Sequence, residues 1–208
     1  MNTPHAALVT LLTRACTLTE RTIIEREGYL RAGVLVPLLL NGPLPELLFT
    51  KRTETVETHK GQISFPGGVA DPLDPDITHT ALRELEEELG IPAACVAPVG
   101  LLDDLATPTG FVITPVLGIM TAMPALAPNR TEVASVFTVP LEFFRKPENA
   151  RSERILLGGE LREVWYYDYL GHEIWGATAL IVRSLLDRIV KAQEASARSD
   201  GMKRDPTL

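Results

Sequence analysis

The sequence predicts an α/β fold in which a sheet of several strands is covered by amphipathic helices. Two long apolar runs, at 31–40 and 111–120, contain branched residues and are bounded by turn-forming residues, as buried strands are. Two other segments, 77–89 and 174–190, repeat their apolar residues at helical spacing. Hydrophobic residues make up 45% of the chain and charged residues 23%, a balance that supports a folded core.

The length of 208 residues suits one domain of generous size. We expect a single domain over 1–190, with an N-terminal helix at about 5–27, and a mobile tail at 191–208 that is poor in large apolar residues. The apolar stretch at 6–12 resembles a signal-peptide core. However, no Lys or Arg precedes it, and Arg14 stands where a processing site requires small residues. We therefore expect a cytoplasmic protein without a membrane segment.

Charge and cysteine content exclude several classes of site. The formal net charge of −7 argues against a nucleic-acid partner, because binding to phosphate backbones normally requires a cationic face. An anionic substrate would have to be met locally, by metal ions and a few placed cations. Cys16 and Cys95 form no CxxC pair, so neither a zinc site nor a disulfide framework is predicted.

Shorter elements surround the long ones. The further strands that the pattern predicts are 46–50, 63–65, 96–102, 135–139 and 164–169. The first of these follows the turn NGPLP and forms a hairpin with 31–40. The turn FPGG at 65–68 precedes the helix at 77–89, for which Asp76 is a predicted N-cap and Gly90 a predicted C-terminal stop.

Three glutamates of this helix share one face. Glu84, Glu87 and Glu88 are spaced three and four residues apart, whereas Glu86 points elsewhere, and Arg83 is the nearest cation. A hard divalent cation such as Mg²⁺, which takes oxygen ligands and bridges carboxylates to phosphates, would relieve their repulsion. Two interpretations remain open at this point: a metal platform for pyrophosphate cleavage, or an exposed acidic helix without function.

The surrounding pattern resembles the box motif of the Nudix hydrolases. Here Gly68 is followed by five residues, Asp74, eight residues and then REL-x-EE-x-GI at 83–91. The usual form is Gly-x5-Glu-x7-Arg-Glu-U-x-Glu-Glu-x-Gly-U, where U is a bulky aliphatic residue. The second half matches at every specified position, whereas the first half has Asp for Glu and one extra residue. The resemblance implies an α/β/α sandwich with a mixed β-sheet.

The longer box and five other segments resemble one Nudix subgroup, the coenzyme A pyrophosphatases. These segments are LFTKRT at 48–53, GQISFPGG at 61–68, TPTGFVITPV at 107–116, EVASVFTVPL at 132–141 and IWGATA at 174–179. The resemblance spans residues 31 to about 190. It implies hydrolysis of the pyrophosphate bond of coenzyme A or acyl-CoA to 3',5'-ADP and (acyl-)phosphopantetheine, with Mg²⁺ or Mn²⁺ as cofactor.

The same resemblance assigns roles to individual residues. The expected catalytic residues are Arg83, Glu84, Glu87 and Glu88. The three glutamates correspond to metal ligands, Arg83 to the partner that orients a carboxylate, and Gly68 to a ligand through its backbone. Glu132 is either a further ligand or base supplied by a loop, or a solvated residue before a strand.

The expected substrate-binding residues are Arg52, Lys60, Gly67 and Gly68. The coenzyme A motif has a second arginine five residues after the one matched by Arg52, but this chain has Glu57 there. Loss of one charge-assisted contact weakens phosphate binding by roughly 1.5 to 3 kcal/mol. Arg52 or Lys60 would then have to compensate, unless the polar segment 51–64 is merely a surface loop. His59 is either a phosphate donor or structural, and we do not count it as catalytic.

The remaining alternatives concern aromatic residues and substrate. The aromatic cluster consists of Trp165, Tyr166, Tyr167 and Tyr169, which either stack on an adenine or pack in the core or a subunit interface. Alternation along a strand favours packing, and a homodimer remains open. The partner expected is a small-molecule nucleoside diphosphate. Glu57 favours another such compound, for example ADP-ribose or a dinucleotide. A Nudix-fold regulator that binds without cleaving is disfavoured by the intact glutamates.

Overall fold

The computed structural model describes residues 5–17, 20–54, 61–157 and 160–202. The central sheet consists of β1 (Leu30–Leu39), β2 (Glu46–Arg52), β3 (Ile63–Ser64), β4 (Gly67–Val69), β5 (Ala97–Leu101), β6 (Leu105–Ala106), β7 (Phe111–Met120) and β8 (Val133–Pro140). A second sheet consists of β9 (Ala150–Leu157), β10 (Glu160–Tyr169) and β11 (His172–Trp175). The α-helices are α1 (Ala6–Thr17), α2 (Ile77–Leu89), α3 (Leu141–Arg145) and α4 (Gly176–Met202), with short 3-10 helices at Ala93–Cys95 and Pro147–Asn149.

Both strand directions occur in the central sheet. Strand β1 runs parallel to β7 along its whole length, from Leu30 opposite Phe111 to Leu39 opposite Met120. On its other side, β1 pairs antiparallel with β4 and β2, and β2 pairs antiparallel with β3 and β8. The sheet is therefore mixed, and β4 lies beside the first half of β1.

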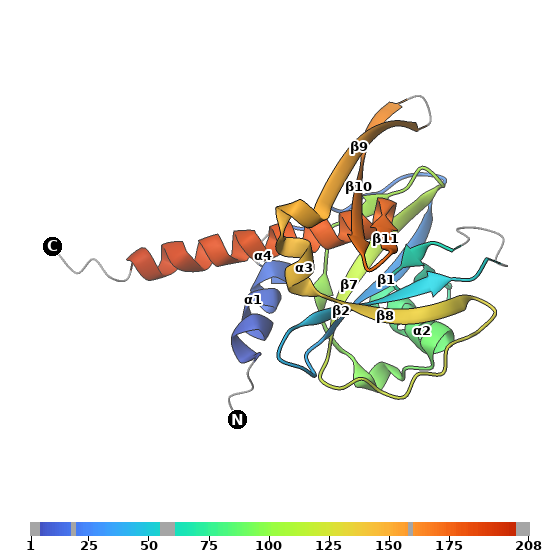
Figure 1. Ribbon diagram of the computed structural model, residues 1–208, viewed down its shortest axis with the longest axis horizontal. Helices are drawn as coiled ribbons and strands as arrows, with labels where there is room; N and C mark the ends of the chain where they lie inside the picture. Colours follow the sequence, from blue (N-terminus) through green and yellow to red (C-terminus); the bar gives the residue numbers. More distant parts are fainter. Residues whose placement is uncertain (1–4, 18–19, 55–60, 158–159, 203–208) are drawn as a thin grey trace.

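Helices cover both faces of the central sheet (Figure 1). Alternate side chains of β1 enter two separate apolar clusters. Leu35 and Leu39 pack in the cluster that includes Leu85 of α2, whereas Val36 packs in the cluster that includes Leu185 of α4. Each fully buried side chain of this kind stabilises the fold by about 1.5 to 3 kcal/mol. The architecture is the expected α/β/α sandwich with a mixed sheet.

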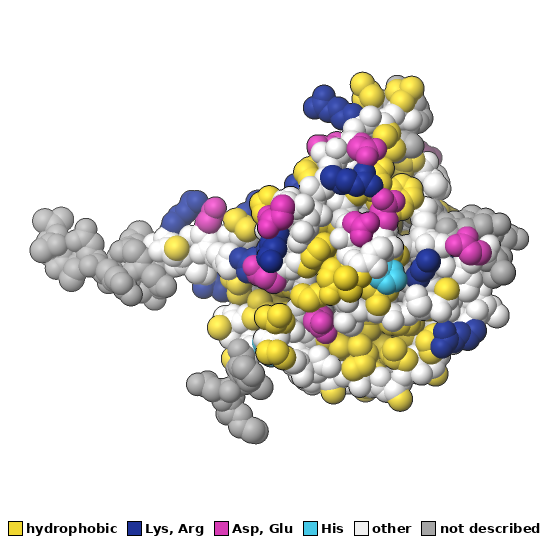
Figure 2. All heavy atoms as spheres, viewed as in Figure 1, with side chains coloured by type: hydrophobic (Ala, Val, Ile, Leu, Met, Phe, Trp, Pro, Cys, Tyr) yellow, Lys and Arg dark blue, Asp and Glu magenta, His cyan; other side chains and the backbone are white. Residues whose placement is uncertain are grey.

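The second sheet projects from the body as a hairpin of β9 and β10, with β11 beside β10 (Figure 1). The sequence does not predict β9, because four of the first five residues of ARSERILL are charged or polar and the run shows no apolar alternation. Basic and acidic side chains are interspersed over this part of the surface (Figure 2). Arg151, for example, pairs with Glu153 at 2.5 Å and with Glu173 at 2.6 Å. The first pair lies within β9, and the second joins β9 to β11 across β10. Such polar contacts accompany a strand that hydropathy does not reveal.

The N-terminal helix is shorter than the sequence indicates. The expected helix at about 5–27 is wrong in its extent, since α1 ends at Thr17. The segment that follows α1 is hydrogen-bonded to the turn after β5. Thr22 N donates to Asp103 Oδ1 at 2.8 Å, and Asp104 N donates to Thr22 O at 2.9 Å. These hydrogen bonds hold the segment in an extended conformation against the body.

The C-terminal helix is longer than the sequence indicates. Instead of ending at 190 before a tail at 191–208, α4 continues to Met202. The added turns are rich in Ala, Gln, Glu and Arg, which are good helix formers. Glu194 pairs with Arg198 at 3.6 Å across one helical turn, and Ala192 is buried. Among the described residues, no helix combines the length and apolar character needed to cross a bilayer. The single domain over 1–190 stays a prediction.

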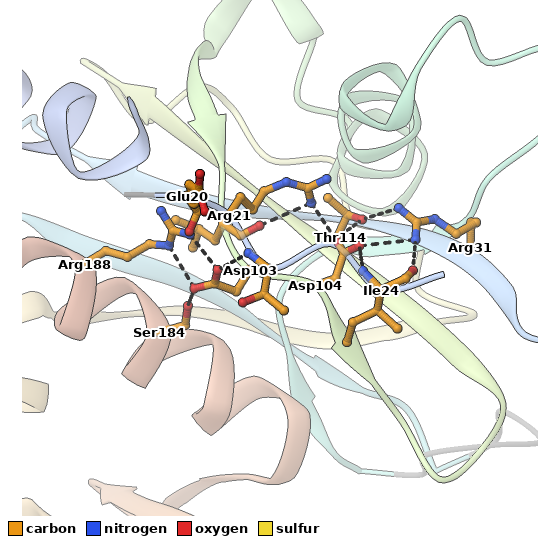
Figure 3. A network of polar contacts seen from close by, with 11 residues as sticks. Glu20, Arg21, Ile24, Arg31, Asp103, Asp104, Thr114, Ser184 and Arg188 are labelled. Carbon is orange, nitrogen blue, oxygen red and sulfur yellow. Dashed lines mark hydrogen bonds and ion pairs between the residues drawn. The ribbon is translucent and has the colours of Figure 1, made fainter. Parts of the chain in front are cut away.

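A polar network joins α4 to the N-terminal segment (Figure 3). Arg188 of α4 is 2% exposed and donates to Asp103 at 2.9 Å from Nε and at 2.6 Å from Nη2. Ser184 Oγ also donates to Asp103, at 3.0 Å, and Arg188 Nη1 donates to Ala15 O at 3.1 Å. Removing Asp103 would leave the buried Arg188 charge without this carboxylate. Because the Asp103 side chain is 32% exposed, the cost should be below the roughly 3 to 5 kcal/mol of a fully buried pair. The network therefore anchors α1 and α4 to the same turn of the central sheet.

Candidate active site

Helix α2 begins and ends where its sequence predicts. The Asp76 side chain accepts a hydrogen bond from His79 N at 2.9 Å, which satisfies one of the free amides of the first turn. Gly90 has a φ of 67°, a left-handed conformation that glycine adopts without strain, and its amide donates to Glu86 O at 2.8 Å. Both predicted caps are confirmed, and they fix which residues of α2 face the sheet.

Glycines allow α2 and β4 to lie very close to β1. A Cβ on Gly33 would come 2.7 Å from Ile77 O at the start of α2, and a Cβ on Gly67 would come 2.6 Å from Gly33 O. Gly68 pairs with Gly33 in the sheet, and a Cβ on Gly68 would lie 2.5 Å from Cδ of Glu84. The backbone of β4 therefore directly contacts the acidic face of α2, as the sequence FPGG suggests.

Arg83 holds two of the glutamates together. Its Nη1 donates to Glu84 Oε1 at 2.7 Å and to Glu87 Oε2 at 3.0 Å, and its Nη2 donates to Val69 O at 3.1 Å. Nε and Nη2 also bind the two oxygens of Asp74, each at 3.1 Å. The hydrogen bonds from Arg83 lower the pKa of Asp74 to about 2. Asp74 thus anchors Arg83, a role that the sequence analysis did not assign, although the box pattern includes the position.

Glu88 turns inward, unlike its neighbours on the helix. It is 5% exposed, and its Oε1 accepts a hydrogen bond from Gly67 N at 3.4 Å. Burial is the main cause that raises the pKa of Glu88, to about 7, and the charges of Glu84 and Glu132 raise it as well. The Gly67 amide and the Arg52 charge act in the opposite direction. Burial likewise raises the pKa of Glu84, opposed by Arg83. The site groups the carboxyl groups of Asp74, Glu84, Glu87, Glu88 and Glu132 around two cations, Arg52 and Arg83, so its formal charge is negative.

The two outer glutamates of α2 are both exposed but differ in their contacts. The Glu87 side chain is 60% exposed and Glu86 is also exposed, whereas only Glu87 contacts Arg83. Across the described stretches, no three His, Cys, Asp or Glu side chains converge into a complete metal-binding group, because Arg83 lies between Glu84 and Glu87. The donor set nevertheless suits a hard divalent cation, since it offers carboxylate oxygens with uncompensated charge next to the backbone of Gly68.

Arg52 ends β2 beside this acidic face. Its charge lowers the pKa of Glu88, which places the guanidinium close to that carboxylate. Its Nε is buried and has no hydrogen-bond partner among the described residues. A buried donor without a partner is costly, so the structure loses stability by holding the Arg52 side chain in this place. The other residues considered in this segment, Glu57, His59 and Lys60, lie outside the part of the chain that the structure describes.

Glu132 lies in the loop before β8 and approaches the same carboxylates. Thr53 N, at the end of β2, donates to Glu132 O at 2.8 Å, and Asn129 Nδ2 donates to Glu132 Oε1 at 3.1 Å. The charge of Glu132 raises the pKa of both Glu84 and Glu88. Strand pairing between β2 and β8 therefore brings Glu132 to the acidic face, about 45 residues along the chain from α2.

The aromatic cluster of β10 lies away from this site and packs as core. Tyr167 is 1% exposed within the cluster between the central sheet and α4, and Trp165 and Tyr169 pack against that cluster. The guanidinium of Arg183 covers the Trp165 ring at 3.5 Å. Tyr166 stacks on Trp175 instead. The packing interpretation of these residues is the one that the structure supports.

Known proteins resemble this chain in sequence and in fold. Residues 29–166 match the family model described as NUDIX domain. A Photorhabdus laumondii protein named "Uncharacterized Nudix hydrolase NudL" is 40% identical over 158 residues, covering 76% of this chain and 84% of that protein. A protein of the same name from Yersinia enterocolitica is 39% identical, covering 76% and 80%. The crystal structure of a MutT/nudix family protein from Enterococcus faecalis shares the fold, with a TM-score of 0.51 at 15% identity over 86% of this chain and 73% of that one.

The matched residues include every described component of the site, from Arg52 at the end of β2 to Glu132 before β8. Members of this family generally use divalent metal ions, which fits the excess negative charge of the acidic face. The chain therefore belongs to the Nudix family and is a Nudix hydrolase, a pyrophosphohydrolase.

Proposed function

We propose that this enzyme hydrolyses the pyrophosphate bond of coenzyme A or acyl-CoA, giving 3',5'-ADP and (acyl-)phosphopantetheine. The observation that carries the proposal is the acidic face of α2, where Glu84 and Glu88 lie against the glycines of β4 with incompletely balanced charge. Glu84, Glu87, Glu88 and the Gly68 carbonyl would hold Mg²⁺ or Mn²⁺. When bound, such an ion neutralises phosphate oxygens and lowers the pKa of coordinated water.

The residues of the chain itself have distinct tasks in this proposal. Arg83, fixed by Asp74, orients the carboxylates of Glu84 and Glu87. Arg52, half-buried at the end of β2, donates from its guanidinium to a phosphate oxygen of the substrate. Glu132 acts as a further ligand or as the base that takes a proton from the attacking water.

The coenzyme A substrate is supported by the arrangement of the subgroup's segments. Segments 48–53, 61–68 and 132–141 contain β2, β3 and β8, and β2 pairs with both of the others. Segment 174–179 is tied to them, because Thr178 Oγ1 donates to Ile63 O at 3.1 Å. Four segments that are distant in sequence thus meet around the end of β2 that carries Arg52, as a shared substrate site requires.

A substrate panel with product identification tests the proposal. Coenzyme A, an acyl-CoA, ADP-ribose and a diadenosine polyphosphate are incubated with the enzyme and Mg²⁺ or Mn²⁺, and the products are separated by chromatography and mass. We expect 3',5'-ADP and phosphopantetheine from coenzyme A at the highest kcat/KM of the panel. Absence of turnover of coenzyme A and acyl-CoA with either metal would contradict the proposed substrate.

A second candidate substrate is another nucleoside diphosphate compound, such as ADP-ribose or a dinucleotide. Glu57 favours it, because an anion stands where the coenzyme A motif has an arginine. The variant Glu57→Arg distinguishes the two candidates. If the enzyme acts on a different compound because of Glu57, the variant gains coenzyme A hydrolysis, by about 10- to 150-fold for one charge-assisted contact. An enzyme already efficient on coenzyme A would gain little.

A further inference from the structure

The loop that carries Glu132 is fastened to the C-terminal end of α2. Ala127 N donates to Leu89 O at 2.9 Å, and Asn129 N donates to Glu88 O at 2.8 Å. These two bonds satisfy carbonyls at the last turn of the helix, which have no partner within the helix itself. The loop therefore begins at a fixed place relative to the residue that provides the buried carboxylate of the site.

Every polar group of Asn129 is engaged in this loop. Its carbonyl oxygen accepts from Glu132 N at 3.0 Å and from Val133 N at 2.8 Å. Its Oδ1 accepts from Thr131 N at 3.2 Å and from Thr131 Oγ1 at 2.7 Å. Because a backbone amide can only donate, the Thr131 contact fixes which side of the Asn129 amide is oxygen. The NH₂ group then faces Glu132, and Nδ2 donates to Oε1 at 3.1 Å.

The backbone of Glu132 is held from both sides. Thr53, the residue after Arg52, donates its amide to Glu132 O at 2.8 Å, and Thr53 Oγ1 donates to Thr131 O at 2.9 Å. With the backbone fixed by β2 on one side and by Asn129 on the other, only the side-chain torsions of Glu132 stay adjustable. The bond from Asn129 Nδ2 to Oε1 restricts them.

We propose that Asn129 is a positioning residue that holds the Glu132 carboxylate at the acidic face of α2 and sets its distance from Glu88. This inference rests on the proposed function, because it concerns the part of Glu132 in that site. Asn129 thus links two residues that the sequence places 44 positions apart, through its backbone amide to the Glu88 carbonyl and through its side chain to the Glu132 carboxylate. Loss of an outer partner of this type typically lowers activity by about 10- to 100-fold.

Asn129→Asp removes the one relevant contact at nearly constant volume. The carboxylate can still accept from Thr131, so the loop keeps that contact, but it cannot donate to Glu132 and repels it. We expect kcat to fall by about 10- to 100-fold while KM changes less than about threefold. Asn149→Asp is the matched control, because Asn149 Nδ2 also donates a single bond, to Phe143 O at 2.8 Å, in the segment after α3. It should leave kcat unchanged.

A double-mutant cycle separates positioning from general damage to the loop. If Asn129 acts through Glu132, the double variant Asn129→Asp with Glu132→Gln is as slow as Glu132→Gln alone, within about twofold. Losses that multiply, or a kcat of Asn129→Asp close to that of the wild type, would overturn the inference. A loss that appears in thermal stability rather than in kcat would also overturn it.

Crystal structures of the wild type and Asn129→Asp test the positioning independently of turnover. We expect the Glu132 carboxylate to move by more than about 1 Å, a displacement large enough to matter for catalysis, while the backbone at 127–133 stays in place. An unmoved carboxylate refutes the inference even if the wild type hydrolyses coenzyme A. A displaced carboxylate in an enzyme that cleaves no panel substrate refutes the proposed substrate class and upholds the positioning.

Discussion

Replacing Gly68 with alanine puts a methyl group against the carboxylate of Glu84. The new Cβ would lie 2.5 Å from both Cδ and Oε1 of Glu84, whereas ordinary van der Waals contact begins at 3.4 Å. The backbone at Gly68 has no positive φ, so alanine is tolerated there by the main chain itself. The strain therefore falls on the Glu84 side chain, which must retreat by about 0.9 Å.

A shift of this size at a catalytic group should lower the reaction rate strongly and the stability of the fold only slightly. Misplacement of reacting groups by about 1 Å lowers rates by about 100-fold. We therefore expect kcat of Gly68→Ala to fall by about two orders of magnitude on the preferred panel substrate. The melting temperature should change little by comparison, because the new Cβ meets the far end of the flexible Glu84 side chain and not backbone.

The assay is steady-state kinetics with thermal melting of the same samples. Gly42→Ala serves as the control, because a Cβ at Gly42 meets nothing within 4 Å. It should match the wild type in both measurements. Turnover of Gly68→Ala within threefold of the wild type would refute the assignment of Glu84 to the catalytic site, as would an equal loss in the control.

Three further perturbations test other contacts. Arg52→Met should raise KM by about 10- to 150-fold, because one charge-assisted contact with the substrate is lost. The melting temperature should not fall, since the removed Nε has no partner in the described structure. An unchanged KM would remove Arg52 from the substrate site. Asp74→Asn should lower kcat by about 10- to 100-fold by weakening the bidentate anchor of Arg83, and normal kinetics would show that the anchor is dispensable. Asp103→Asn should lower the melting temperature at pH 7, and the gap from the wild type should close as the pH falls. Burial raises the pKa of Asp103, but the bonds from Arg188 and from the backbone outweigh burial and hold it well below its usual range. The stabilisation is thus present above a pH of about 4, the pKa of an unfolded aspartate, and is lost below it; a gap independent of pH would contradict this.

Local signals in the sequence were sufficient for the catalytic helix. Asp76 and Gly90 bound α2 as capping rules predict, since each acts through contacts within three or four residues. The C-terminal helix shows the opposite case. Its end was placed at 190 because the following residues lack an apolar stripe, yet helix propensity and the contact of Ala192 with the body carry α4 to Met202. Hydropathy alone understates a helix that extends beyond the core.

Contacts between distant segments could not be derived from the sequence. Spacing on a helical wheel grouped Glu84, Glu87 and Glu88, but it could not show that Glu88 is buried against Gly67 while Glu87 stays exposed. The contact of Asn129 with Glu132 is local, but its position beside α2 depends on the distant bond from Asn129 N to Glu88 O and on the pairing of β2 with β8. A residue such as Asn129, whose proposed role is to orient another side chain, belongs to no motif that the sequence would reveal.

Binding of Mn²⁺ to the acidic face of α2 tests the central claim most directly. Electron paramagnetic resonance measures free Mn²⁺ during titration of the wild type, Glu87→Gln and Glu86→Gln. Each variant removes one charge at nearly constant volume from neighbouring exposed positions of the same helix. We expect Glu87→Gln to weaken Mn²⁺ binding by at least about tenfold and to lose most turnover, while Glu86→Gln behaves as the wild type. Equal affinities in all three proteins, or equal losses in both variants, would contradict the account.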